Sequence, residues 1–291
     1  MSRYDVLYIF IIKSLEAIPY KGLFYIGKVL ALLLNTLPNK HKRISKANLE
    51  LVFPHKTSLQ INSILRDSLF HSIMNILEAG LVWGKQGYKK KPGFINIKNF
   101  SEIETALSSD KGVLLFTPHI GNIEIIINFL GRHTNCTVPY TQPKNKALDK
   151  VITNSRNKSG VKMVDTNISG IKEMLSALKN KKLVAVASDQ VPKKGGGIIS
   201  KFFNNEIYSM TLLPKLQQRT GCIAYLMYCE RKEKGEGFVI HFDRKIDLSS
   251  NIQEGVDKMN NEFEKCIMKL PGQYSWEYKK FKRTKLDSIY K

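Results

Sequence analysis

From residue 94 onward, short apolar segments alternate with amphipathic ones, and this alternation restricts the fold more than any other feature of the sequence. Apolar segments rich in β-branched and aromatic residues predict buried strands, and segments with apolar residues at helical spacing predict helices. Strands that alternate with helices need crossover connections. We therefore predict an α/β fold with a mainly parallel or mixed central sheet flanked by helices. The expected strands are 113–117, 137–140, 183–187, 223–228 and 238–242, and the expected helices between and after them are 146–157, 170–180, 209–220 and 254–269.

A longer helix is expected before this region. Thr57 and Gln60 have the spacing of a capping box, and apolar residues then recur at helical spacing as far as Leu81. His71 on this helix is expected to be structural. Residues 84–93 are predicted to form a loop, and the Gly-rich segment 191–209 is predicted to be a mobile loop beside a binding site.

The first 40 residues combine apolar runs with aromatic and basic residues. Charged residues and a proline interrupt every run before it reaches the ~18 uncharged residues of a clear spanning helix. This pattern is typical of helices that lie in a membrane interface. We predict a membrane-associated helical segment at 1–40 and a single α/β domain at 41–291. The alternative is an ordinary buried helical hairpin in a soluble protein.

The chain is strongly basic, with 46 Lys and Arg against 25 Asp and Glu, a formal net charge of +21. Such an excess attracts anionic partners, which include nucleic acids, anionic membranes and phosphorylated or acidic substrates. An AT-rich genome that favours Lys codons would be an alternative explanation. The four cysteines are scattered without metal-ligand spacing, so we predict reduced core residues and no metal site.

The segment "GVLLFTPHIGNIE" at 112–124 places a histidine between a predicted strand and a predicted helix. His119 falls in the strand-to-helix turn, where open α/β sheets carry their chemistry, and Glu124 falls in the first turn of the helix. A carboxylate there is favoured by the helix dipole, and it could accept a hydrogen bond from the imidazole and make it a better base. The alternative is a histidine that caps a helix in a core turn.

Other polar residues follow predicted strands or end predicted helices. Asp189 and Gln190 come directly after the strand at 183–187, so Asp189 and His119 are expected to share one crevice if the sheet is parallel. Arg156 ends a helix and could hold a phosphate or carboxylate, although a solvated arginine is as common. Asn122 precedes the helix after His119, and with Arg156, Asp189 and Gln190 it is a candidate for substrate binding. The sequence contains no Gly-x-Ser-x-Gly or Cys–His motif, so a covalent acyl-enzyme is not indicated.

Several of these motifs, in this order, resemble the late lipid A acyltransferases, the lauroyl and myristoyl acyltransferases of Gram-negative endotoxin synthesis. The similarity extends from about residue 5 to residue 285, and the C-terminal motif makes it specific. Two departures, Gln142 where an arginine is expected and the absence of a glycine after the Phe pair, bear on the identity of the acceptor. The motifs are "HIGNIE", "SDQ", "GGG…KFFNN", "LQQRTG" and "CIMKLPGQYSWEYKKFKRTK".

The resemblance implies a glycerolipid-acyltransferase-like fold and an enzyme at the cytoplasmic face of the Gram-negative inner membrane. It implies transfer of a fatty acyl chain from acyl carrier protein to a hydroxyl of a Kdo-containing lipid A precursor, with no cofactor. The co-substrate would be acyl-acyl carrier protein or acyl-coenzyme A. His119 and Glu124 match the family's His-x4-Asp/Glu dyad, and Arg156 and Asp189 match an arginine and an acidic residue of the family.

These observations lead to a mechanistic hypothesis. His119, oriented by Glu124, acts as general base on the acceptor hydroxyl, which attacks the donor thioester directly. Lys279, Lys280, Lys282 and Arg283 are expected at the face that meets the acidic carrier protein, the anionic membrane lipid and the acceptor. One alternative is an acyltransferase of the same fold that acts on a glycerophospholipid, ornithine lipid or glycolipid. A second is a non-catalytic basic protein that binds membranes or nucleic acid, although no nucleic-acid partner is expected.

Overall fold

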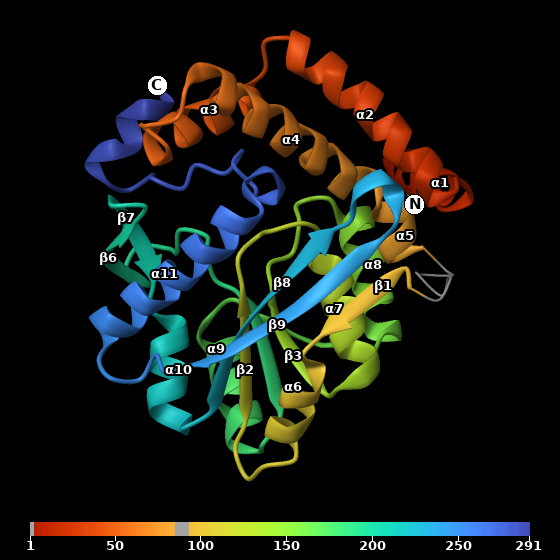
Figure 1. Cartoon of the computed structure of the whole chain (residues 1–291). Helices are drawn as coiled ribbons and strands as arrows, with labels where there is room; N and C mark the ends of the chain where they lie inside the picture. The colour runs from red at the N-terminus through yellow and green to blue at the C-terminus, as the bar shows by residue number, and fades with distance from the viewer. Residues whose placement is uncertain (1–2, 85–92) are drawn as a thin grey trace.

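The structure is a computed structural model, which describes residues 3–84 and 93–291. Its centre is a seven-stranded sheet in the order β1-β9-β8-β2-β5-β3-β4, in which β8, β2, β5, β3 and β4 are parallel (Figure 1). β9 is antiparallel to β8, and β1 is parallel to β9. The predicted α/β fold with a mainly parallel, mixed sheet is therefore confirmed. The strands of this sheet are β1 Ile95–Lys98, β2 Val113–Thr117, β3 Cys136–Tyr140, β4 Lys162–Asp165, β5 Leu183–Ala187, β8 Ile223–Arg231 and β9 Phe238–Ile246.

Helices cover both faces of the sheet, and the alternation of side chains along β2 shows how two cores form. Leu114 and Phe116 face one core, while Val113 and Leu115 face the other, and all four are fully buried. The first core is closed by α3, α4, α9, α10 and α11 and the second by α5, α6 and α7. The helices are α1 Arg3–Ala17, α2 Tyr20–Thr36, α3 Lys40–Val52, α4 Ser58–Leu77, α5 Ala79–Trp83, α6 Phe100–Leu107, α7 Ile123–His133, α8 Lys146–Lys158, α9 Ile168–Lys179, α10 Leu212–Thr220 and α11 Ile252–Lys269.

The predicted capping box starts α4 as expected. The side chain of Thr57 accepts a hydrogen bond from the backbone N–H of Gln60, and the Gln60 side chain accepts one from the backbone N–H of Thr57. The two reciprocal bonds satisfy N–H groups that the first turn of a helix leaves unpaired.

The segment at 191–209 differs from the prediction of a mobile loop. It contains an antiparallel hairpin of β6 Gly197–Phe202 and β7 Asn205–Met210, packed beside α11 (Figure 1). Gly195 and Gly197 donate backbone hydrogen bonds to the hydroxyl of Tyr208, which fixes the glycine-rich start of the hairpin. The helix expected from residue 209 consequently begins at Leu212. The hairpin forms because β6 and β7 pair with each other, and a local sequence pattern does not show which segments will pair.

Strand pairing also explains why two strands are longer than predicted. β8 and β9 extend to Arg231 and Ile246 because they pair with each other along most of their length. The short edge strands β1 and β4 were not predicted, since each has only four residues, of which three are exposed in β1 and two in β4, and so carries little hydrophobic signal. Of the loop predicted at 84–93, residues 85–92 lie outside the described part of the chain.

The N-terminal segment forms two helices. α2 packs along α4, while α1 packs against α5 and α8 (Figure 1). Among the described residues, no individual helix is long and apolar enough to cross a bilayer. α1 and α2 reach that length and hydropathy only as a pair, from Leu7–Ala17 and Tyr20–Thr36, with a bend of 116° at the break.

Candidate active site

The turn after β2 carries His119 and has a backbone that only glycine fits at one position. Gly121 has a φ of 61°, and a Cβ there would lie 2.1 Å from the carbonyl oxygen of Cys229. A C-terminal segment, residues 271–275, forms two backbone hydrogen bonds with this turn. The N–H of Gly121 donates to the Gln273 carbonyl over 2.9 Å, and the N–H of Ser275 donates to the His119 carbonyl over 3.0 Å.

The imidazole of His119 is held by Asp189, which follows the neighbouring strand β5. Nδ1 of His119 lies 2.5 Å from Oδ1 of Asp189, and the His119 backbone N–H donates to Oδ2 over 3.2 Å. The expectation that the two residues share one crevice at the carboxyl ends of parallel strands is therefore met. Since Nδ1 is engaged by the carboxylate, Nε2 is the ring nitrogen left for proton exchange.

His119 and Asp189 shift each other's pKa in the directions expected for a general base and the carboxylate that orients it. Burial favours the neutral imidazole, but the Asp189 carboxylate outweighs burial and raises the pKa of His119 above its ordinary value. Burial likewise opposes ionisation of Asp189, yet His119 lowers the pKa of Asp189 to about 2. The carboxylate thus stays ionised at neutral pH and stabilises a proton on the ring.

Glu124 has different partners from those expected. Its carboxylate accepts hydrogen bonds from Nη2 of Arg156 over 2.5 Å, from Nε of Arg156 over 3.3 Å and from the Trp83 indole over 3.1 Å. Among the described contacts, none joins Glu124 to His119. The predicted hydrogen bond within the dyad is therefore replaced by two separate pairs. Arg156 offers a planar fork that satisfies both carboxylate oxygens, whereas an imidazole could satisfy only one.

Asn122 caps the helix that follows His119. Its side-chain oxygen accepts a hydrogen bond from the Glu124 N–H over 3.0 Å, and its amide donates to Glu78 over 2.8 Å. Both ends of this buried side chain are thus engaged within the protein.

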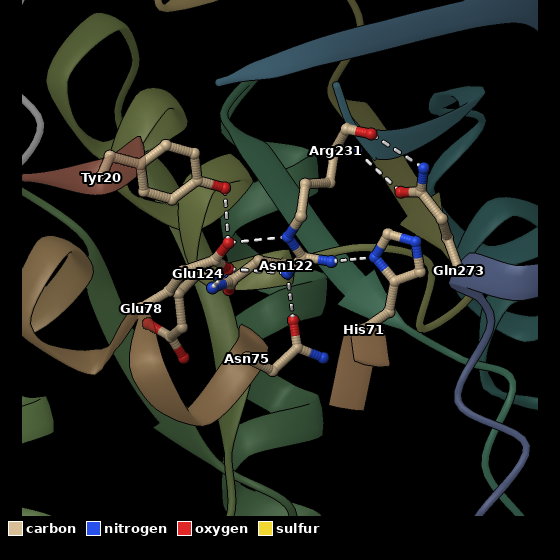
Figure 2. Close-up of polar contacts among 8 residues, drawn as sticks. All are labelled: Tyr20, His71, Asn75, Glu78, Asn122, Glu124, Arg231 and Gln273. Carbon is tan, nitrogen blue, oxygen red and sulfur yellow. Dashed lines mark hydrogen bonds and ion pairs between the residues drawn. The ribbon is translucent and has the colours of Figure 1, made fainter. Parts of the chain in front are cut away.

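Behind Asn122 lies a buried polar network centred on Arg231, at the end of β8 (Figure 2). Arg231 and Glu78 have fully buried side chains and form two hydrogen bonds of 2.7 Å. Arg231 also lies 2.6 Å from Nδ1 of His71 and donates to Asn75, and Tyr20 donates to Glu78 over 2.7 Å. Burial, reinforced by Arg231, holds the pKa of His71 well below its usual value, so His71 acts as a neutral acceptor.

A cavity of about 520 Å³ opens beside His119. This volume is in the range of pockets that bind small molecules and cofactors. Its walls are mostly apolar, and Arg156 and Gln190 also line it, whereas Asn122, Glu124 and Asp189 do not. The lining includes Thr117, His119, Ile123, Ile126, Ile127, Val138, Pro139, Tyr140, Arg156, Met174, Val186, Gln190, Pro192, Lys193, Leu212 and Met227.

Lys280 lies beside this site rather than on the surface as expected from the basic run that contains it. Its side chain is buried, donates to the Asp189 carbonyl and lies 4.8 Å from the centroid of the Phe202 ring. Burial lowers the pKa of Lys280 to about 8. Lys280 also opposes the effect of Asp189 on the pKa of His119. The sequence "YKKFKR" at 278–283 gave no signal that one of its four basic residues would be buried.

Residues 1–283 match the family described as bacterial lipid A biosynthesis acyltransferase. The chain belongs to this family. It is therefore an acyltransferase, as the motifs predicted.

Named relatives agree with this family. The lipid A biosynthesis palmitoleoyltransferase of Escherichia coli K12 is 22% identical over 267 residues, which are 91% of this chain and 86% of the relative. A lipid A biosynthesis acyltransferase of Haemophilus influenzae is 25% identical over 282 residues, 93% of this chain and 87% of the relative. The lipid A biosynthesis lauroyltransferase of E. coli K12 is 23% identical over 273 residues, 91% and 87% of the two chains.

Proposed function

We propose that this acyltransferase moves a fatty acyl chain from acyl carrier protein to a hydroxyl of a Kdo-containing lipid A precursor, by direct transfer with His119 as general base. The observation that supports it best is the contact between His119 and Asp189 at an apolar cavity of about 520 Å³. An apolar wall suits a hydrocarbon chain, and a base at its edge suits a reaction at the end of that chain.

In the proposed reaction His119 takes the proton of the acceptor hydroxyl through Nε2. The hydroxyl oxygen attacks the thioester carbonyl carbon, the carbon–sulfur bond of the tetrahedral intermediate breaks, and the thiolate takes the proton from the imidazolium. Asp189 stabilises the imidazolium because its carboxylate is already hydrogen bonded to Nδ1. No covalent acyl-enzyme is needed, so both substrates must be bound together and positioning supplies much of the rate.

Glu124 then acts through Arg156 rather than through the imidazole. The Arg156 guanidinium lines the cavity, lies 4.9 Å from the centroid of the Tyr140 ring and is fixed by the Glu124 carboxylate. A fixed cation beside the reacting centre would stabilise the oxyanion of the tetrahedral intermediate. Asp189 and Glu124 thus position different groups, and Gln190 on the cavity wall is a residue for substrate contact.

We place the enzyme at the cytoplasmic face of the inner membrane of a Gram-negative cell. The proposal is supported by the exposed apolar side chains of α1 and α2 and by the net charge of +21, since anionic lipid attracts a nearby Lys or Arg by about 1 kcal/mol each. The acidic carrier protein would be attracted by the same charge.

A transfer assay with purified enzyme tests the donor and the acceptor together. Radiolabelled acyl chains are supplied on acyl carrier protein or on coenzyme A, against a lipid A precursor with Kdo, the same precursor without Kdo, and a glycerophospholipid. We expect label on the Kdo-containing precursor from the carrier-protein donor. Label on the glycerophospholipid alone would overturn the acceptor assignment, and equal rates from coenzyme A would overturn the donor assignment.

A further inference from the structure

A second cavity, of about 800 Å³, lies at the N-terminal helices. It is bounded by α2, α4, the turn η1 at Glu233–Gly235 between β8 and β9, and the segment that follows α11. It shares no lining residue with the cavity beside His119. Its lining comprises Phe24, Lys28, Ala31, Leu32, Asn35, Arg66, Asp67, Phe70, His71, Arg231, Lys232, Glu233, Lys234, Lys269, Leu270, Pro271, Gly272 and Gln273.

Among the charged side chains that line this cavity, cations outnumber carboxylates. Besides Arg231, whose charge is balanced by Glu78, it contains five basic side chains, of which Lys269 pairs with Asp243 at 3.8 Å, and two carboxylates, so the local balance still favours an anion. Within residues 3–84 and 93–291, neither Lys28 nor Lys234 forms an ion pair, and both are exposed. The five are Lys28, Arg66, Lys232, Lys234 and Lys269, and the carboxylates are Asp67 and Glu233.

One wall of the cavity continues into an exposed apolar surface. Phe24 and Phe70 meet edge to face, with ring centroids 5.1 Å apart, and both line the cavity. Leu32 also lines it, yet 64% of Leu32 is exposed. Other large apolar side chains of α2 are exposed as well, although they do not line the cavity, and an exposed apolar face is the arrangement of a helix in a membrane interface. They are Tyr25, Ile26, Val29, Leu30 and Leu33.

We propose that this cavity binds the headgroup of an anionic membrane phospholipid, whose acyl chains lie along the exposed face of α2. A ligand that fits must carry negative charge at one end and hydrocarbon at the other. Positive charge alone would suit a soluble phosphate, but the exposed Leu32, one helical turn from Lys28, would then remain in water. The occupant is therefore a lipid rather than a free anion.

The inner wall of this cavity connects to the turn that carries His119. His71, Arg231 and Gln273 form that wall and belong to the buried network of Figure 2. The side chain of Gln273 accepts from the N–H of Arg231 and donates to its carbonyl, and the carbonyl of Gln273 accepts from Gly121. A bound lipid would thus rest on the residues that hold the catalytic turn. This inference depends on the membrane location of the proposed function, but not on acyl transfer.

Binding of short-chain lipid to the full-length enzyme in a non-ionic detergent tests the proposal. Native mass spectrometry and calorimetry would use dihexanoyl phosphatidylglycerol, dihexanoyl phosphatidylcholine and inorganic phosphate as separate probes. We expect one saturable molecule of phosphatidylglycerol per chain and at least about tenfold weaker binding of the other two probes, in line with the worth of nearby cationic side chains. Phosphate that binds as tightly as phosphatidylglycerol would overturn the choice of a lipid, and equal binding of phosphatidylcholine would overturn the choice of an anion.

Two charge-matched double variants locate the site. Lys28→Gln with Lys234→Asn removes two charges from the cavity, and asparagine tolerates the positive φ of 54° at Lys234. Lys179→Gln with Lys181→Asn removes two exposed charges at the end of α9, where Lys181 has a φ of 59°. We expect phosphatidylglycerol binding to weaken about 10-fold or more in the first variant and to stay within about twofold in the second.

Equal loss in both variants would mean diffuse attraction to a basic protein, and no loss in the first would place the lipid elsewhere. Either result overturns the proposal. The transfer assay, run on wild-type enzyme, separates the two hypotheses, since acyl transfer does not require this cavity to hold a lipid.

Discussion

Two ion pairs lie near the carboxyl ends of the central strands, and they differ in exposure and in contact with the cavity beside His119. His119 and Asp189 have 24% and 4% of their side chains exposed, and His119 lines the 520 Å³ cavity. The side chains of Arg231 and Glu78 are completely buried; Glu78 accepts hydrogen bonds from Tyr20 and Asn122, and Arg231 donates one to Asn75. Arg231 carries a permanent positive charge, whereas His119 is charged only when protonated, so only the first pair can exchange a proton with a substrate.

The comparison distinguishes residues that can react with a substrate from residues that only stabilise the fold around them. The Arg231 network ties α2, α4, β8 and the cap of α7 together, so it fixes the position of the turn without touching the cavity beside His119. His119, in contrast, is partly exposed and lines the cavity, where it is open to a substrate. The predictions that follow would break or sharpen this contrast.

The largest expected effect belongs to His119→Ala. Removing the proposed base should lower turnover by about 10²–10⁴-fold, the usual contribution of a positioned general base. Initial rates with a labelled acyl donor measure it, and thermal unfolding checks that the variant is folded. His55→Ala, which removes an exposed histidine, is the control and should retain wild-type turnover. Near wild-type turnover in His119→Ala would remove this residue from the mechanism.

Glu78→Gln should be the most damaging to stability. The change leaves Arg231 buried without its carboxylate, which typically costs about 3–5 kcal/mol of unfolding free energy. Chemical denaturation measures the loss. Glu50→Gln is a matched control, because Glu50 pairs with Lys46 at 3.6 Å on the surface and such pairs contribute less than about 1 kcal/mol. Similar losses in the two variants would show that the Arg231 network does not support the fold.

Asp189→Asn should change the pH dependence of catalysis. Asp189 raises the pKa of His119, while burial opposes it, so the neutral amide should let the pKa fall. Because the base works only when deprotonated, the rise of kcat/KM with pH should move to lower pH, and the plateau should fall. Asp110→Asn, at an exposed position, should leave the profile unchanged. A profile that stays in place, or moves to higher pH, would mean that Asp189 does not set the protonation of His119.

The smallest expected effect is that of Asn122→Ala. Loss of the α7 cap should cost about 0.5–2 kcal/mol of unfolding free energy, and the lost hydrogen bond to Glu78 adds to it, so Asn145→Ala, which removes only the cap of α8, should cost less. If Asn122 acts only as a cap, KM for the acceptor should not change beyond the change seen with Asn145→Ala. A selective rise in KM would restore the sequence-based prediction that Asn122 binds substrate.

The position of each reactive residue along the chain was predictable, and so was the shared crevice of His119 and Asp189, but the hydrogen-bond partners were not. The apolar run at 113–117 and the helical spacing after Asn122 placed His119 in a strand-to-helix turn, and "SDQ" placed Asp189 at the end of a neighbouring strand. The sequence predicted a hydrogen bond between His119 and Glu124 because the two residues are close along the chain. Arg156 and Trp83, 32 and 41 positions from Glu124, take that carboxylate instead.

Local sequence determined the strands β2, β3 and β5, the capping box of α4 and the turn that holds His119, because hydrophobic periodicity and turn chemistry depend on near neighbours. Only the tertiary structure decided that Asp189 orients the imidazole, that Glu124 holds Arg156, that Lys280 is buried and that 197–210 forms a hairpin. The partners of a buried charge are fixed by which elements the fold brings together, and electrostatic energies depend on that spacing and burial rather than on distance along the chain.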